Sequence, residues 1–223
     1  MMGYLKCNYN SRLFFDPTYP DIDFDTFNDG AEWKELYGDV TKAIPPNASD
    51  PRGKSVDLCM WVDSDHAGEK LTKLSRTWYF ILLNTALTNW LSKKQATIEG
   101  SVFGADLVAM NTGVEAIRGI RYKMRMMGVP LTGPTYVYGD NMSVIYNTSR
   151  PESTLKKKSN SICYHAVREA IASGECLTLY CKTGDKYSDM MTKLFYGQKK
   201  QDKVSHIIYD IWDHEDGPEP AKK

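Results

Sequence analysis

Residues 56–63 read Val-Asp-Leu-Cys-Met-Trp-Val-Asp, an apolar run that ends in an aspartate. The run has the length, the two-residue alternation and the branched and aromatic side chains of a β-strand. Four further segments have the same character; they are 77–83, 88–92, 135–139 and 176–182. The first three strands are consecutive, which predicts an antiparallel meander.

Helical patterns surround the later strands. Residues 101–127 carry apolar side chains at helical spacing, and Gly128 and Pro130 follow where such a helix would stop. Shorter helices are expected at 141–148, 164–173, 188–195 and 204–212. Strands that alternate with helices predict a mixed α/β fold in which helices flank a sheet.

Composition divides the chain into three parts. Residues 1–55 are acidic and contain a loop rich in proline, so we expect a tether there. The compact domain is expected over 56–196, and 197–223 are expected to hold a C-terminal helix and a polar tail that frays. With 223 residues, of which 42% are hydrophobic, the chain can fill a core, which excludes disorder throughout.

Charge and cysteine content exclude several classes of protein. The 28 Lys and Arg residues balance 28 Asp and Glu residues, so any nucleic-acid surface must come from local clusters. The five cysteines show no spacing typical of a zinc site, which favours a reducing compartment. No apolar run reaches the ~18 residues that span a bilayer, and the N-terminus lacks a signal-peptide pattern. We expect an intracellular protein, cytoplasmic or nuclear, without a membrane partner.

Four aspartates each fall on a different predicted element. Asp63 and Asp140 end strands, Asp106 lies on the apolar stripe of the long helix, and Asp189 lies in the first turn of a later helix. Carboxylates gathered from separate elements could surround divalent cations, which prefer oxygen ligands. Turn formation, helix capping and the helix dipole are simpler roles that stay open for all but Asp106. A carboxylate on a buried face needs a cation or hydrogen bonds to compensate it.

Seven short motifs follow one another along residues 61–193. They are WVDSDHAG (61–68), SRT (75–77), NWLSKKQ (89–95), ADLVAM (105–110), YGDNMS (138–143), YHAVRE (164–169) and SDMMTK (188–193). In this order they resemble the elements YSDADWAG, RRSTSG, ISWSSKKQ, AEYIAL, YCDNQSA, YHFVRE and ADILTK of the ribonuclease H domain of copia-type (Pseudoviridae) retrotransposon Pol polyproteins. Residues 3–6 (GYLK) also resemble part of the RYLKGT stretch that precedes this domain in the family.

The resemblance implies a fold, a reaction and a set of site residues. The fold is a ribonuclease H-like five-stranded mixed sheet flanked by helices. The reaction is hydrolysis of the RNA strand of RNA/DNA hybrids with two Mg²⁺ ions, for which Mn²⁺ is an expected substitute. By motif, the catalytic and metal-binding acids fall on Asp63, Asp106, Asp140 and Asp189. A reverse transcriptase supplied by another chain is an expected partner.

Five basic residues are candidates for contacts with the phosphates of a hybrid. They are Arg118, Arg121, Lys156, Lys157 and Lys158. The two arginines belong to a basic stretch, 117–139, that holds no acid, and the lysines form a short run. Clusters of this kind also occur on solvated helix faces, so both interpretations stay open.

Two other functions compete with an active nuclease. The family usually has glutamate where this chain has Asp106, and a carboxylate with a shorter reach can misplace a metal ion. This substitution favours a catalytically impaired remnant that at most binds nucleic acid or a polymerase. Asp63-Ser64-Asp65 also fits the Asp-x-Asp motif of a nucleotide-sugar glycosyltransferase, but that function leaves Asp140, Asp189 and the ordered motifs unexplained.

Overall fold

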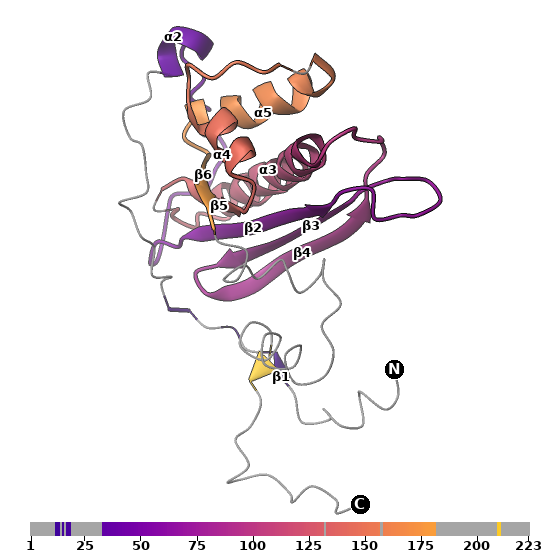
Figure 1. Ribbon diagram of the computed structural model, residues 1–223. Helices are drawn as coiled ribbons and strands as arrows, with labels where there is room; N and C mark the ends of the chain where they lie inside the picture. The colour runs from indigo at the N-terminus through magenta and orange to yellow at the C-terminus, as the bar shows by residue number, and fades with distance from the viewer. Residues whose placement is uncertain are drawn as a thin grey trace, which may run out of the picture.

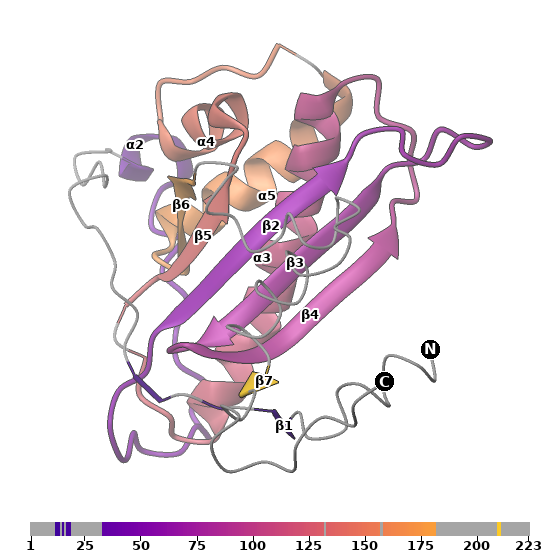
Figure 2. The same cartoon turned by 60° about the horizontal axis from the view of Figure 1, so that its bottom comes forward.

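A five-stranded mixed sheet is the centre of the molecule (Figures 1 and 2). The computed structural model describes residues 12–13, 15, 17–18, 33–131, 133–156, 158–181 and 209–210. The strands are β2 (Leu58–Asp65), β3 (Arg76–Leu83), β4 (Ala86–Lys94), β5 (Thr135–Gly139) and β6 (Cys176–Tyr180). Their order is β4-β3-β2-β5-β6; β2, β3 and β4 pair antiparallel, whereas β5 is parallel to both β2 and β6. The predicted meander and the mixed sheet are confirmed.

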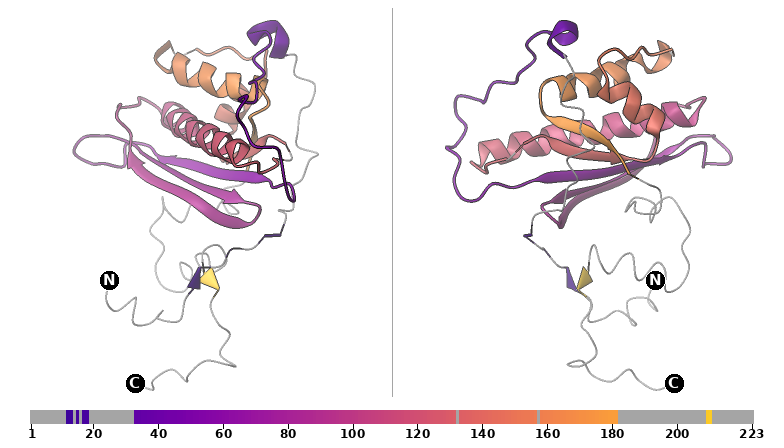
Figure 3. Two further views of the ribbon diagram at one scale, coloured as in Figure 1. Left: turned by 180° about the vertical axis from the view of Figure 1, so that it is seen from behind. Right: turned by 60° about the vertical axis from the view of Figure 1, so that its left-hand side comes forward.

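The long helices cover one face of this sheet. They are α3 (Val102–Met126), α4 (Met142–Ser149) and α5 (Ser161–Ala172), and α5 follows the short 3₁₀ turn η2 (Lys158–Asn160). Figure 3 shows α3 lying between the sheet and α5, in agreement with the packing of α3 against β2, β3 and α5. The predicted fold class, a five-stranded mixed sheet flanked by helices, is therefore confirmed.

The core fills the space between α3 and the central strands. Met60, Val114 and Ile117 are fully buried there. Gly113 allows the close approach, because a Cβ at that position would lie 2.5 Å from Met60 Cε. Ser101 caps α3 by accepting a hydrogen bond from the Gly104 amide (3.2 Å), and Gly128, with φ of +71°, follows its C-terminal end.

Part of the expected tether packs on the domain. Helix α2 (Trp33–Tyr37) lies against α5, at the far side of the helical layer from the sheet (Figure 1). Further along, Lys42 forms a salt bridge with Glu175 (3.1 Å). Within the segment expected to be a C-terminal helix, Tyr209–Asp210 instead form a strand, β7, paired with β1 (Arg12–Leu13). The helix expected at 188–195 lies outside the described residues.

None of the helices in the described part of the chain combines the length and apolar character needed to cross a membrane.

Candidate active site

Three of the four predicted site residues line one small pocket at an edge of the sheet. Strands β2 and β5 are parallel neighbours, so their carboxyl ends lie at the same edge. Asp63 lies near the end of β2, Asp140 directly follows β5, and Asp106 lies near the start of α3. These three aspartates line the pocket together with Asn141, Val62, Met110, Gly139 and Val144. The structure thus brings together acids that are far apart in the sequence.

Asp106 points into the protein, as its place on the apolar stripe predicts. The residue is 9% exposed. Its Oδ1 accepts a hydrogen bond from Ser64 Oγ (2.5 Å), and its Oδ2 accepts one from Asn141 Nδ2 (2.8 Å). These bonds compensate the burial of a carboxylate beside the core. Sequence reasoning did not select Ser64 or Asn141, although each directly follows a selected aspartate.

The donors of this pocket fit a hard divalent cation in chemistry, because carboxylate oxygens are the ligands that Mg²⁺ and Mn²⁺ prefer. Asp189, the fourth predicted ligand, lies outside the described residues. Among the residues that are described, no group of three or more His, Cys, Asp or Glu side chains is arranged so that it could hold a metal ion. The metal assignment of Asp63, Asp106 and Asp140 therefore stays a prediction.

The two arginines selected for phosphate contacts are engaged inside the protein. Arg121 is 5% exposed and donates to the Gly133 carbonyl (2.8 Å) and Thr135 Oγ1 (3.2 Å). Burial lowers the pKa of its guanidinium. Arg118 donates from Nε to Glu175 (3.0 Å) and forms a salt bridge with Glu115 (3.2 Å). Both side chains thus join α3 to neighbouring elements.

The lysines selected for phosphate contacts lie on the segment between α4 and α5. Lys156 and Lys158 are exposed, whereas Lys157 lies outside the described residues. Exposed ammonium groups on a loop can contact phosphates without a cost in burial. Of the four predicted nucleic-acid-binding residues that the structure describes, Lys156 and Lys158 are exposed, as the role requires.

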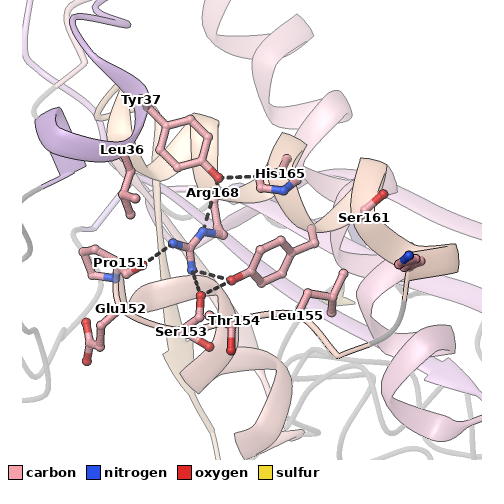
Figure 4. Close-up of a pocket in the computed structure, with 12 residues that line it drawn as sticks. Leu36, Tyr37, Pro151, Glu152, Ser153, Thr154, Leu155, Ser161, His165 and Arg168 are labelled. Atoms are coloured by element: carbon pink, nitrogen blue, oxygen red, sulfur yellow. Dashed lines mark hydrogen bonds between the residues drawn. The ribbon is translucent and has the colours of Figure 1, made fainter.

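A second pocket, of about 520 Å³, lies between α2, α5 and the loop that follows α4 (Figure 4). Arg168, which is 3% exposed, reaches across it. Its guanidinium donates to the carbonyls of Arg150 and Pro151 and to the Tyr164 hydroxyl, each at 2.7 Å. It also donates to the Tyr37 hydroxyl (3.2 Å), which lies 2.8 Å from His165 Nδ1. The sequence signal for this cluster is the YHAVRE motif (164–169), which contains Tyr164, His165 and Arg168.

Comparisons with known proteins find sequence similarity to retrovirus-related Pol polyproteins. No protein-family model matches it. It is 28% identical over 142 residues to the retrovirus-related Pol polyprotein from transposon RE1 of Arabidopsis thaliana, and 25% identical over 142 residues to that from transposon RE2. Each match covers 64% of this chain and 10% of the relative, so the chain spans about a tenth of the length of these relatives.

Ribonucleases H occur among the similar solved structures. The N-terminal ribonuclease H domain of rv2228c from Mycobacterium tuberculosis matches with a TM-score of 0.48 and 10% identity, over 68% of this chain and 97% of that one. LC11-RNase H1 in complex with an RNA/DNA hybrid matches with a TM-score of 0.46 and 8% identity, over 58% and 88%. In sequence, the chain is similar to a segment of retrovirus-related Pol polyproteins from plant transposons.

Proposed function

We propose that this protein is a metal-dependent endonuclease of copia-type retrotransposon origin that hydrolyses the RNA strand of RNA/DNA hybrids. The observation that carries the proposal is the pocket at the ends of β2 and β5, which is lined by carboxylates from three separate elements. The seven ordered motifs support it, and so does the similarity to retrovirus-related Pol polyproteins. An intracellular location and a reverse transcriptase on another chain are parts of the same proposal.

In this proposal, Asp63, Asp106 and Asp140 are the metal ligands, and Asp189 completes the set. When bound, two Mg²⁺ or Mn²⁺ ions supply an activated water and stabilise the leaving 3′ oxygen. The protein holds the carboxylates in place: Asp63 and Asp140 through neighbouring strands, and Asp106 through its hydrogen bonds to Ser64 and Asn141. Lys156 and Lys158 would contact the phosphates, which gives affinity without sequence preference.

The test is cleavage of a labelled RNA/DNA hybrid by the full chain with Mg²⁺ and then Mn²⁺. We expect cleavage by the wild type and none by Asp140→Asn, which keeps the size of the side chain but removes its charge. Asp57→Asn is the matched control, because Asp57 lies just before the start of β2, eight residues before Asp65 at the end of the strand that carries Asp63. Cleavage that persists in Asp140→Asn, at the wild-type rate, would count against the proposed site.

The same experiment separates the active enzyme from an impaired remnant. A folded wild type that does not cut, combined with cleavage by Asp106→Glu, would show that the aspartate at position 106 silences the site. A folded wild type and Asp106→Glu that are both inactive would refute the proposed activity.

A further inference from the structure

The two residues that follow the strand-end aspartates both bind the third aspartate of the pocket. Ser64 follows Asp63 in β2, and its hydroxyl donates to Oδ1 of Asp106. Asn141 follows Asp140 at the start of α4, and its amide donates to Oδ2 of the same side chain. Each carboxylate oxygen of Asp106 therefore accepts a hydrogen bond, one from each of the two neighbouring strand ends. This arrangement connects α3 to both strands at the pocket.

The orientation of the Asn141 amide is determined by its own helix. Its Oδ1 accepts hydrogen bonds from the backbone amides of Ser143 (3.1 Å) and Val144 (3.4 Å), as an N-cap does. The nitrogen side of the amide must then face Asp106. The opposite orientation would turn a carbonyl oxygen toward a carboxylate and an NH₂ group toward two backbone donors. The cap of α4 thus ensures that Asn141 acts as a donor toward Asp106.

We infer that Ser64 and Asn141 are positioning residues that hold Asp106 at the acid pocket. The inference rests on the proposed function, because it assigns them a role in that same site. Asp106 is shorter than the glutamate of the family that the motifs resemble, and a donor on each carboxylate oxygen restricts the rotation of its side chain. Substitution of a residue that orients a metal ligand in this way typically weakens metal binding by about 10- to 100-fold.

The test removes each donor while keeping the rest of its contacts. Ser64→Ala deletes the hydroxyl, and Ser64→Thr restores it. Asn141→Ser keeps an oxygen that can cap α4 but loses the amide that reaches Asp106. Asn147→Ser is the matched control on the same helix, because Asn147 binds Ser143 and Ser153 instead. For each full-length variant we would measure Mn²⁺ affinity by calorimetry, hybrid cleavage, and melting in metal-free buffer.

We expect Ser64→Ala and Asn141→Ser each to weaken Mn²⁺ binding by about 10-fold or more, whereas Ser64→Thr and Asn147→Ser keep the wild-type affinity. If both test variants lower the melting temperature but keep the wild-type Mn²⁺ affinity and cleavage, the two residues are structural only and the inference is wrong. If the wild type itself neither binds Mn²⁺ nor cleaves, the proposed function fails, and the positioning role fails with it. Should Ser64→Ala not fold, Ser64→Cys, with its weaker donor, replaces it with the same expected direction.

Discussion

Replacing Arg168 tests whether this buried guanidinium holds the helical layer together. Arg168→Met keeps an unbranched side chain of similar length but removes every donor. The carbonyls of Arg150 and Pro151 and the Tyr164 hydroxyl would each lose a 2.7 Å hydrogen bond from a charged group. The contacts of the guanidinium with the rings of Trp33 and Tyr164, at 4.9 and 4.7 Å from the ring centres, would disappear as well.

The magnitude follows from these contacts. Hydrogen bonds from charged donors contribute at least about 1.5 kcal/mol each, so the three short ones together contribute about 4.5 kcal/mol. The adjoining pocket lets water replace part of the lost bonding, and we therefore expect unfolding to become easier by about 3 to 4 kcal/mol. For a protein of this size, that loss corresponds to a fall in melting temperature of roughly 10 °C.

Urea denaturation followed by circular dichroism measures this loss. Arg150→Met is the comparison variant: Arg150 stacks on Tyr146 and donates to its hydroxyl (2.9 Å), but this pair is exposed to water, so the substitution should cost about 1 kcal/mol or less. Arg168→Lys should fall between the wild type and Arg168→Met, because one ammonium group cannot reach all of the acceptors. A loss below about 1 kcal/mol for Arg168→Met would refute this account of the cluster.

Three further predictions concern stability and thiol reactivity. Gly113→Ala should be less stable than Gly119→Ala by about 1 kcal/mol or more, because its Cβ would lie 2.5 Å from Met60 Cε and the buried methionine must shift; Gly119→Ala, with no such neighbour within 4 Å, should stabilise the protein by about 0.5 kcal/mol or more. Burial by itself raises the pKa of Glu175, but Lys42 and Arg118 outweigh it, so the pKa lies below 4.5. The stability that Glu175 contributes should be complete above pH 4.5 and lost as the pH falls through the lowered pKa, so in urea titrations the deficit of Glu175→Gln should shrink in acid. Burial raises the pKa of Cys59 and Cys176 to about 12, so both thiols should resist alkylation in the native state and react only after unfolding, which mass spectrometry can follow.

Local patterns located most of the fold, because the elements that matter are long and well delimited. The helix predicted over 101–127 spans Val102–Met126, since Ser101 caps its start and Gly128 follows its end. The strand predicted over 88–92 extends to Ala86–Lys94, because pairing with β3 continues beyond its apolar centre. Three of the four acids that line up as site residues in the sequence do lie at one pocket. They could be selected because the end of a strand and the apolar face of a helix both leave a recognisable pattern in the sequence.

The contacts that could not be predicted join residues far apart in the chain. Arg118 has the charge of a phosphate ligand in the sequence, but its partner Glu175 lies 57 positions away and becomes a neighbour only because α3 packs against α5, which ends just before Glu175. Tyr37 and Arg168 are 131 positions apart, so the sequence indicated a tether where α2 instead packs on α5. The donors to Asp106 likewise depend on which strands are adjacent, which periodicity does not specify.

Helix α4 connects the acid pocket to the lysine-bearing loop. Its first turn is capped by Asn141, which also binds Asp106, and its last turn and the residue after it present the carbonyls of Asn147 and Arg150 to Arg168. With eight residues it is about 12 Å long, a separation at which substitutions usually act independently. Asn141→Ser should therefore weaken metal affinity, and Arg168→Met should weaken hybrid binding by loosening the loop that carries Lys156 and Lys158. In the double variant, the loss of metal affinity should equal that of Asn141→Ser and the loss of hybrid affinity that of Arg168→Met; a deviation above about 0.5 kcal/mol in either binding free energy would show that α4 transmits strain between its ends instead of serving as a rigid spacer.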